Sequence, residues 1–475
     1  MIHKPIQLSH ISFTIPHKIC FDDFSVHIPY GSRIAIIGQN GSGKSSLLKI
    51  LNQTLEPTNG DIKISEGVTI GYVPQVIETF DSLSGGERIN QSLTVALRQN
   101  PNVLLLDEPS NHLDQKNRQS LIRMLGSFAG ILIIVSHDLE LLSSCIETLW
   151  HIDNGKIHIF SGNYHDYQRE RQIKQAVIEQ KLSRLKREKK EIHCSLMGEE
   201  KRAAKSRSKG EKSIDNRKWP TIVSNSKALR AEETSGLKKA NISHKKQRLL
   251  DELSLLRLPE TIIPQFSFTA ADVKSRSLIS ISRGSIGYDP NHLILSHIYL
   301  TLGSQDRIAI VGNNGSGKST LIKAILGDPA ILKSGHWFMP KPEEIGYLDQ
   351  HYGTLCADES VFETIQALVP DWSYTEIRNY LNHFLFREHE EVEALVKVLS
   401  GGEKARLTLA QIGCKTPKLL LLDEMTNNLD LETRAHVISV LKEYPGGLIV
   451  ISHDVDFLQA MGISKGSTIE IGALS

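Results

Sequence analysis

Short apolar runs recur along the chain, and four of them come immediately before glycine-rich or acidic segments. The runs at 34–37 and 308–311 are each followed by a glycine-rich turn and then by a segment with helical character. The leucine runs at 104–106 and 420–422 each end in an Asp-Glu pair. Short apolar runs that are bounded by turns and alternate with helices predict buried strands of an α/β fold.

The middle of the chain has a different pattern, which predicts two helices. Residues 163–197 contain no glycine and no proline, and their sparse apolar residues fall at near-helical spacing. These apolar residues are Ile173, Val177, Leu182 and Leu185. A loop is predicted at about 206–226, around Gly210 and Pro220, and a second helix at about 227–257. Two helices joined by a loop form a hairpin.

The two glycine-rich turns share the pattern G-x-x-x-x-G-K-[ST], which is typical of a phosphate-binding loop between a strand and a helix. Backbone N–H groups of such a loop surround phosphate oxygens, and the positive end of the helix dipole adds to the attraction. We expect Lys44 and Lys318 to reach the β- and γ-phosphates of a bound nucleotide. We expect Ser45 and Ser319 to hold Mg²⁺. The predicted loop residues are Gly38, Gln39, Asn40, Gly41, Ser42, Gly43, Lys44, Ser45 and Ser46 in the first copy, and Gly312, Asn313, Asn314, Gly315, Ser316, Gly317, Lys318, Ser319 and Thr320 in the second.

The chain repeats one ordered set of motifs. Each loop is followed by a glutamine, a Leu-Ser-Gly-Gly-Glu segment, an Asp-Glu pair, a further aspartate and a Ser-His-Asp segment. The copies are offset by 274 residues at the lysines and by 316 residues at the later motifs. This set resembles the ATP-binding cassette (ABC) ATPases over residues 4–160 and 277–472, and Leu-Ser-Gly-Gly-Glu (the signature segment) is its most specific element. The resemblance implies two P-loop nucleotide-binding domains, or cassettes, of α/β fold.

The acidic pairs can be given roles on chemical grounds. Asp107 and Asp423 end apolar strands, where their carboxylates would hold Mg²⁺ through its water shell. Glu108 and Glu424 follow directly and would orient or activate the attacking water. Each copy therefore carries both a candidate metal ligand and a candidate catalytic carboxylate.

The ABC resemblance implies further site residues. His137 and His453 resemble the switch histidine that contacts the γ-phosphate. Gln75 and Gln350 resemble the glutamines that sense Mg²⁺ and water. Each of these four residues follows its phosphate loop in the order that the family has.

The same resemblance implies that each signature segment completes the site of the opposite cassette. The expected pairings are Lys44 and Glu108 with Ser400 and Gly402, and Lys318 and Glu424 with Ser84 and Gly86. Tyr288 lies 30 residues before Lys318 and would stack on the adenine. The first copy has no residue to which we assign this stacking role.

Two features separate the copies. After its Asp-Glu pair, the second copy has Met425 where the family has proline and Asn428 where it has histidine, which predicts a less rigid loop. Seven residues separate the glutamine from the signature segment in the first copy, against 48 in the second. The longer segment, 351–398, contains helix-like runs at about 359–368 and 374–386. By resemblance it is the helical subdomain, which the first copy almost lacks.

The amino-acid composition limits the cellular compartment and the class of protein that we expect. A chain of 475 residues with 40% hydrophobic content can bury two cores. No apolar run approaches the roughly 18–20 residues of a membrane span, and the N-terminus has no signal pattern. The five cysteines lack metal-ligand spacing, which suits a reducing compartment. We therefore expect a cytoplasmic protein without membrane insertion.

The net charge of +1 conceals a basic segment in the middle of the chain. Residues 168–258 hold 25 Lys or Arg and 12 Asp or Glu, so the rest of the chain is acidic. Excess cations can contact nucleic-acid phosphates, and tryptophan or arginine can stack on exposed bases. A solvated linker and a site for anionic lipid are the alternatives, and we favour RNA binding. The expected RNA-binding residues are Lys201, Arg202, Lys205, Arg207, Lys209, Arg217, Lys218 and Trp219.

The tandem cassettes, the Asn-His-Leu-Asp wording at 111–114, the Gly-Asn-Tyr segment at 162–164 and the basic hairpin together resemble the ABC-F proteins. The resemblance implies cassettes at 1–162 and 263–475 that pair within a monomer, joined by an α-helical hairpin linker at 163–262. It implies ATP hydrolysis with Mg²⁺ and binding to the ribosome, at large-subunit rRNA and tRNA near the peptidyl-transferase centre. Some members adjust translation, and others displace ribosome-targeting antibiotics.

Two other readings compete with this one. An ATPase subunit of an ABC transporter with fused cassettes is the first, and the reduced first helical subdomain and the basic hairpin disfavour it. A DNA-repair or chromosome ATPase is the second, and it calls for zinc-binding cysteines or very long coiled coils, which the sequence lacks.

Overall fold

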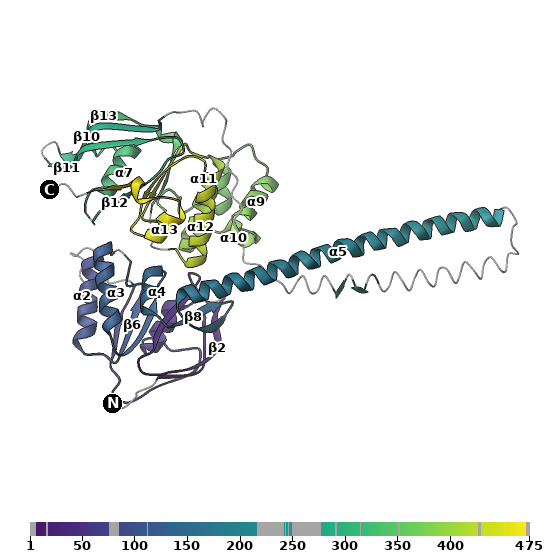
Figure 1. Cartoon of the computed structure of the whole chain (residues 1–475), viewed down its shortest axis with the longest axis horizontal. Helices are drawn as coiled ribbons and strands as arrows, with labels where there is room; N and C mark the ends of the chain where they lie inside the picture. Colours follow the sequence, from purple (N-terminus) through teal and green to yellow (C-terminus); the bar gives the residue numbers. More distant parts are fainter. Residues whose placement is uncertain are drawn as a thin grey trace. The chain divides into compact units, whose positions relative to one another are not determined.

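The computed structural model divides the chain into two compact units, each with its own internal packing (Figure 1). The larger unit contains residues 1–167 and 261–475, and the smaller unit is Gln168–Glu260. The domain boundaries predicted from the sequence remain predictions. The structure describes residues 6–15, 18–75, 85–111, 113–215, 242, 244–245, 247–248, 277–289, 292–313, 315–349, 352–425 and 429–471.

A six-stranded sheet carries the phosphate loop and the acidic pair of the first cassette. Its strand order is β5-β6-β7-β3-β8-β9, and only the β8–β9 pair is antiparallel. Strands β6 (Val103–Asp107) and β7 (Ile131–Val135) are buried at every residue, as expected for parallel strands covered on both faces. The other strands are β3 (Arg33–Gly38), β5 (Ile70–Val73), β8 (Thr148–Asp153) and β9 (Lys156–Ser161).

Two apolar clusters lie on opposite faces of this sheet. Alternate residues of β3 point to opposite faces, so Ile34 and Ile36 belong to one cluster and Ala35 and Ile37 to the other. The first cluster joins the sheet to an antiparallel sheet and a helix: β1 (Ile6–Ile15), β2 (Lys18–Ile28), β4 (Asn59–Ile64) and α1 (Lys44–Leu51). The second joins it to three helices: α2 (Gly85–Arg98), α3 (Gln115–Ser127) and α4 (Leu139–Cys145).

The second cassette repeats this arrangement. Its central sheet has the order β14-β15-β16-β12-β17 and is parallel throughout, beside an antiparallel sheet of order β11-β10-β13. The predicted tandem α/β cassette fold is therefore confirmed. The strands are β10 (Ile279–Asp289), β11 (His292–Leu302), β12 (Arg307–Val311), β13 (Leu332–Phe338), β14 (Ile345–Leu348), β15 (Leu419–Asp423), β16 (Gly447–Ile451) and β17 (Thr468–Glu470). Four helices correspond to α1, α2, α3 and α4 of the first cassette: α7 (Lys318–Leu326), α11 (Gly401–Cys414), α12 (Leu431–Glu443) and α13 (Val455–Ala460).

The second cassette also has three short helices between β14 and α11. They are α8 (Val361–Gln366), α9 (Tyr374–His383) and α10 (His389–Glu393). The first two confirm the helix-like runs predicted in this segment, and each begins with a capping box of serine and glutamate. Phe384 and its neighbours join the core that also contains α11 and α12. The longer segment is therefore packed structure of the second cassette.

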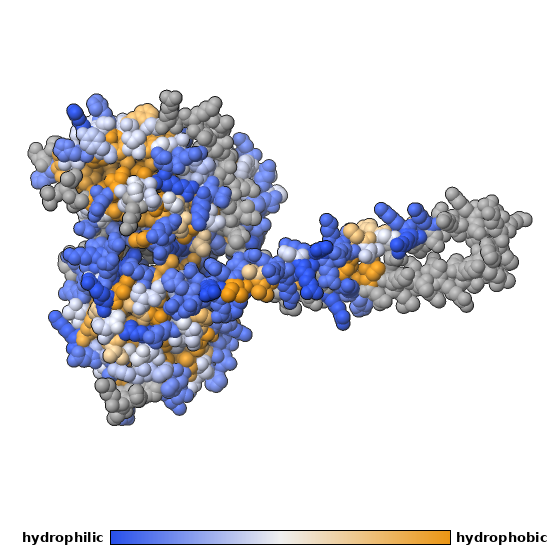
Figure 2. Space-filling view, in the orientation of Figure 1, coloured by the Kyte–Doolittle hydropathy of each residue, from blue (hydrophilic) through white to orange (hydrophobic). Residues whose placement is uncertain are grey.

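The linker begins as one long helix, α5 (Tyr164–Asp215), of 52 residues or about 78 Å. The loop predicted from residue 206 is therefore wrong for 206–215, where the helix continues. The reason is energetic, since Gly210 costs only about 1 kcal/mol relative to alanine and lysine and glutamate beside it favour helix. Figure 2 shows a mostly hydrophilic surface along the described part of α5, interrupted by apolar groups. None of the described helices is long and apolar enough to cross a membrane.

The smaller unit contains a helix-to-helix contact, as a hairpin requires. Leu185 and Ile192 of α5 are buried and pack with Ile242, and Lys245 Nζ lies 3.3 Å from Glu188 Oε1. The described residues between 242 and 248 are helical. This contact supports the predicted second helix over that short range.

The apolar stripe predicted on this helix is only half correct. Leu182 and Leu185 are buried, whereas Ile173 and Val177 are 57% and 58% exposed. The described contact with the second helix lies near Leu185 and Ile192, and Ile173 is 12 residues or about 18 Å further along the helix axis. Apolar spacing therefore identified the apolar positions of the helix but not which of them are buried.

The start of α5 is fixed by the first cassette. The side-chain oxygen of Asn163 accepts a hydrogen bond from Asp166 N at 3.0 Å, which caps the first turn. Tyr164 is buried in the cluster on the helix-covered face of the first sheet, and Tyr167 Oη lies 3.2 Å from His151 Nδ1. The Gly-Asn-Tyr segment is thus a helix cap followed by an anchor.

Both cassettes use one arginine to hold the C-terminal ends of two helices. Arg33 donates to Gly126 O at 3.0 Å and Phe128 O at 2.9 Å, at the end of α3, and to Cys145 O of α4 at 3.4 Å. Arg307 donates in the same way to carbonyls at the ends of α12 and α13, those of Lys442, Tyr444 and Met461. The last carbonyls of a helix have no partner within it, and a cation there also opposes the helix dipole.

Replacing Arg33 or Arg307 with methionine should therefore destabilise the corresponding cassette by ~1–3 kcal/mol, because several partly buried helix-end carbonyls lose a charged donor. Urea unfolding, with hydrogen exchange at the last turn of α3 or α12, measures the effect. The matched control is the exposed Arg98→Met. Losses no larger than that of the control would contradict the role given to the two arginines.

Candidate nucleotide sites

The phosphate loops hold their lysines in the same way in both cassettes. Lys44 Nζ donates to Gly38 O and Gln39 O at 2.8 and 2.9 Å, and Lys318 Nζ donates to Gly312 O and Asn313 O at 2.7 and 3.0 Å. Burial lowers the pKa of both lysines, and nearby carboxylates oppose this shift. Each ammonium group is therefore a buried cation held by carbonyl oxygens of its own loop.

The loops leave hydrogen-bonding groups for an anion. Helices α1 and α7 begin after Gly43 and Gly317, which lie in the left-handed region and provide no side-chain cap. A Cβ at Gly43 would lie 2.9 Å from that of Cys20, so glycine is required there. The hydroxyls of Ser42 and Ser316 are buried and have no hydrogen-bond partner among the residues that the structure describes. Unpaired N–H and O–H groups at a helix start fit a phosphate.

The predicted metal ligands are brought together in each cassette. The hydroxyl of Ser45 is hydrogen-bonded to Asp107, and that of Ser319 to Asp423. Burial raises the pKa of both aspartates. Oδ1 of Asp107 is buried without a hydrogen-bond partner in the described part of the chain. A hydroxyl beside a desolvated carboxylate is a donor set that fits Mg²⁺.

Each predicted catalytic glutamate lies beside its histidine. His137 Nε2 is 3.3 Å from Glu108 Oε1, and His453 Nε2 is 3.8 Å from Glu424 Oε1. Burial lowers the pKa of His137 to about 3 and that of His453 to about 4, so both rings are neutral at pH 7. Both glutamates have positive φ, 51° and 48°, in the left-handed region that non-glycine residues seldom adopt. Such backbone strain is often found at functional sites.

The two glutamates differ in their surroundings. The side chain of Glu108 is 8% exposed and that of Glu424 is 24% exposed. Burial, with a smaller contribution from Asp107, raises the pKa of Glu108 to about 8 against the opposing effect of Lys44. The first cassette therefore encloses its candidate catalytic carboxylate more completely than the second.

The signature segments begin helices, as predicted. Ser400 caps α11 in a capping box with Glu403, and a Cβ at the buried Gly402 would lie 2.8 Å from Thr433 Oγ1. In the first cassette α2 begins at Gly85, and Gly86 is buried.

Two hydrogen bonds within the larger unit join the phosphate loop of the first cassette to the start of α12 in the second cassette. Asn40 N donates to Asp430 Oδ2 at 3.1 Å, and Gln39 Nε2 donates to Glu432 Oε2 at 2.9 Å. The sequence identifies Asp430 as one of the repeated motif residues, but it does not predict this contact with the first phosphate loop. The expected pairings of Ser400 and Gly402 with Lys44 and Glu108 remain predictions.

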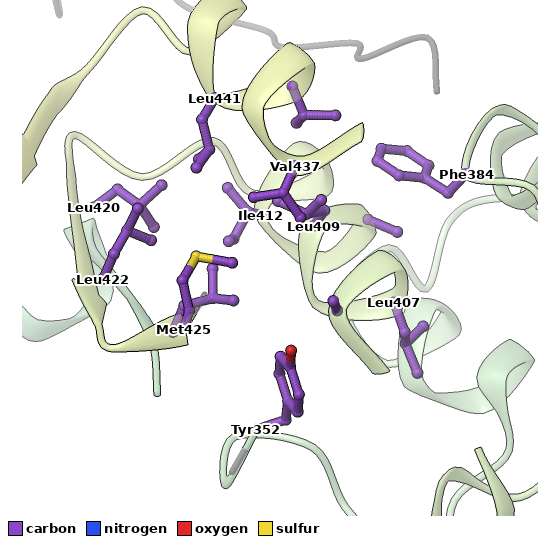
Figure 3. Packing of buried hydrophobic residues seen from close by; sticks show 14 of the residues in the cluster. Tyr352, Phe384, Leu407, Leu409, Ile412, Leu420, Leu422, Met425, Val437 and Leu441 are labelled. Carbon is purple, nitrogen blue, oxygen red and sulfur yellow. The ribbon is translucent and has the colours of Figure 1, made fainter. Parts of the chain in front are cut away.

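The structure also shows the positions of several other residues that the sequence analysis singled out. Gln75 follows β5 and is exposed, and Tyr288 is exposed on β10. Met425 is buried between the leucines of β15 and those of α11 (Figure 3). Its side chain therefore anchors the start of the loop that the sequence predicts to be less rigid. Predicted residues outside the described ranges are Ser84, Asn314, Gln350, Asn428, Arg217, Lys218 and Trp219.

A tyrosine that the sequence motifs did not identify lies beside each aspartate that we predict to be a metal ligand. Tyr347 is hydrogen-bonded to Asp423, and the negative charge of Asp107 helps burial to raise the pKa of Tyr72 to about 12. Both tyrosines lie three residues before the repeated glutamines, at the same offset of 275. This repeated position was the signal that could have identified them.

Comparisons with known proteins agree with this geometry. The family model described as "ABC transporter" matches residues 21–79 and 295–427. YheS of Haemophilus influenzae, described as a probable ATP-binding protein, is 30% identical over 96% of this chain and 77% of its own length. The chain belongs to the ABC-F family of ATP-binding cassette proteins.

Two further relatives extend the comparison. The ribosome protection protein VmlR of Bacillus subtilis is 27% identical over 97% of this chain and 86% of its own. The ATP-binding protein Uup of Buchnera aphidicola subsp. Schizaphis graminum is 29% identical over 91% and 76%. The predicted family and the tandem ATP-binding cassettes are thus confirmed.

The burial of Glu108 predicts a pH-dependent stability in the absence of nucleotide and metal. A carboxyl whose pKa rises on folding, here from 4.5 to about 8, favours the folded state only while it is protonated. Its contribution is therefore complete below pH ~4.5 and lost as the pH rises to about 8. Glu108→Gln removes this titration, so the stability of the variant relative to the parent should increase across this window.

Thermal unfolding of the two proteins in EDTA, from pH 5 to 9, measures the difference. Glu56→Gln, which replaces an exposed glutamate of the same cassette, is the matched control. A pH dependence for Glu108→Gln no larger than that of the control would show that the glutamate is not desolvated as described.

Proposed function

We propose that this chain hydrolyses ATP to ADP and phosphate at two sites and that it uses this cycle to act on the ribosome. The hydrolytic part is carried by one observation: in each cassette a glutamate lies beside a neutral histidine, at the C-terminal ends of the parallel strands, where the phosphate loop begins. The ribosomal part is supported by membership of the ABC-F family, by the basic linker and by the likeness to VmlR.

The chain's own groups suit phosphoryl transfer to water. Ser45 with Asp107, and Ser319 with Asp423, would hold Mg²⁺ bound to the nucleotide phosphates, and this cation supplies charge neutralisation when it is present. Asp107 would thereby place positive charge near Glu108, which lowers its pKa and favours the carboxylate.

The remaining groups would position water and phosphate. Glu108 and Glu424 accept a hydrogen bond from the attacking water and orient it. A neutral histidine donates one N–H to a γ-phosphate oxygen, and the lysine ammonium contacts the β- and γ-phosphates. Each signature segment completes the site of the opposite cassette, and the Asn40–Asp430 hydrogen bond is consistent with this pairing.

The basic linker is the proposed contact with rRNA or tRNA. Lys201, Arg202 and Lys205 lie within one turn of α5 and are exposed. Arg207 and Lys209 lie on the same helix, and the tip residues Arg217, Lys218 and Trp219 complete the expected set. We place this contact near the peptidyl-transferase centre of the large subunit, where a monomer could adjust translation or displace an antibiotic. The part of the proposal that concerns antibiotics rests on the name of VmlR alone.

Changing both glutamates to glutamine should leave ATP binding intact and nearly abolish turnover, because positioned acid–base groups contribute roughly 10²–10⁴-fold. Phosphate release and the binding of a fluorescent ATP analogue measure the two effects separately. We expect the ATP-bound double variant to accumulate on ribosomes. The exposed pair Glu56→Gln with Glu443→Gln is the matched control, and undiminished phosphate release by the Glu108 and Glu424 double variant would refute the assignment.

Replacing Lys201, Arg202 and Lys205 with alanine should weaken ribosome binding and flatten its salt dependence, by roughly 0.7 in the logarithmic slope for each phosphate that is no longer neutralised. Co-sedimentation with ribosomes at several salt concentrations measures both effects. ATP turnover without ribosomes should not change. The control removes the same charge from the first cassette, with alanine at Lys63, Lys116 and Lys156.

Equal losses for the two sets would favour a general charge effect over a binding arm. If the parent protein co-purifies with membrane proteins and not with ribosomes, the transporter-subunit reading replaces the ribosomal one.

A further inference from the structure

Each cassette contains a largely enclosed arginine one helical turn after the aspartate that caps the helix following the acidic pair. Arg118 is in α3, which Asp114 caps, and Arg434 is in α12, which Asp430 caps. The backbone N–H groups of the two arginines donate to the carbonyls of these aspartates at 2.9 and 2.8 Å. The first turn of each helix is therefore fixed relative to its capping residue.

The side chain of each arginine forms an ion pair with a second aspartate. Arg434 Nη2 lies 2.8 and 2.7 Å from the two carboxylate oxygens of Asp454. Arg118 Nε lies 3.1 Å from Asp138 Oδ2. The arginine side chains are only 6% and 12% exposed, so water screens these pairs weakly.

These second aspartates directly follow the histidines of the two sites, His137 and His453. Each aspartate also caps the next helix: Asp138 Oδ1 accepts from Glu140 N at 3.0 Å, and Asp454 Oδ1 accepts from Phe457 N at 2.9 Å. The backbone N–H of each aspartate donates at 3.1 Å to the serine that precedes the histidine. The histidine thus lies in a closed Ser-His-Asp turn whose last carboxylate the arginine holds.

A purely structural link between these helices would not need charge. Apolar side chains of similar volume join helices without the cost of desolvating two ions, and replacing a buried ion pair with them is often neutral or stabilising. An ion pair instead fixes the direction of a carboxylate. Its recurrence in both cassettes, beside the one neutral ring that approaches the glutamate, indicates a function in orienting that ring.

We propose that Arg118 and Arg434 are positioning residues that hold the histidine of their own cassette against its glutamate. The inference rests on the proposed hydrolytic role of Glu108 and Glu424. Neither arginine contacts nucleotide in this account. Each acts through the aspartate beside the histidine, so its loss should lower kcat for ATP without changing ATP binding.

The test isolates one site at a time. Glu108→Gln leaves the second cassette's glutamate to act, and Glu424→Gln leaves the first. These two parents are measured before any arginine is changed. If neither parent loses turnover, the proposed hydrolytic function fails by itself, independently of the arginines.

Arg434→Met is then introduced into both parents. In the Glu108→Gln parent we expect kcat to fall roughly 10- to 100-fold with KM for ATP nearly unchanged, because displacement of a catalytic group is costly in rate. In the Glu424→Gln parent the fall in kcat should be clearly smaller, because Arg434 is only a charged neighbour of His137 and does not hold the turn that carries it. Arg118→Met should give the reverse pattern, and the exposed Arg123→Met is the control on α3.

A second variant separates positioning from stability. Removing one partner of a buried pair leaves an unpaired charge, so Arg434→Met alone can lower the melting temperature or prevent folding. Arg434→Met with Asp454→Asn removes both charges and keeps an oxygen to cap α13. We expect this double variant to regain thermal stability but not kcat, whereas Arg434→Lys, which keeps a point charge, should recover part of kcat.

Two results would overturn the inference. Recovery of kcat together with stability in the double variant would make the pair a structural link. Equal losses in both parents would mean that Arg434 does not act specifically on His453.

Discussion

Each cassette depends on a lysine ammonium that is buried at the end of its central strand. Lys44 and Lys318 are removed from water and held by carbonyl oxygens of their own loops. A buried cation needs opposite charge nearby, and the parallel sheet supplies it, because the carboxyl ends of its strands meet at one edge. Asp107 and Glu108 leave β6 at this edge, and His137 leaves the intervening β7. The same arrangement desolvates the carboxylates, raises their pKa and leaves them suited to a cation that arrives with phosphate.

Both cassettes contain this arrangement of buried charged groups, but the residues around the charged groups differ between the cassettes. Both copies retain the Arg-Asp pair beside the histidine and the arginine that holds two helix ends. They differ in the enclosure of the glutamate, in the helices α8 to α10 and in Met425. Buried charge tolerates little change because an unpaired partner is costly, whereas apolar surroundings can be repacked if volume is kept.

The linker separates its two tasks along one helix. Its first turn is anchored by Tyr164 in the core of the first cassette, and Lys201, the first of the cations proposed to contact RNA, lies 37 residues later. A continuous helix keeps these groups at a fixed spacing, at the modest cost of the glycines within it. The acidic cassettes and the basic linker give the chain a nearly neutral total charge but an uneven distribution, so its association with polyanions should depend on salt.

The sequence by itself determined the fold class, the duplication, the family and most members of the candidate site. Phosphate loops, acidic pairs and signature segments are local patterns whose backbone geometry follows from nearby residues, and their order identified the cassettes. The helices at 359–368 and 374–386 were also predictable from short-range periodicity and capping. The local pattern gave a wrong prediction where two conformational preferences oppose each other. At Gly210 it predicted a loop, but the helix continues because the neighbouring residues favour helix more strongly than one glycine disfavours it.

Only the tertiary structure decided which distant groups meet. Leu185 is buried and Ile173 is exposed although both are apolar residues of one helix, and the ion pairs of Arg118 and Arg434 join residues 20 positions apart in sequence. The different enclosure of Glu108 and Glu424, which have the same local sequence context of leucine and aspartate, likewise arises from packing. Side-chain contacts, burial and pKa values depend on residues that the whole fold brings close together. The distance in space between two such residues cannot be read from their separation along the chain.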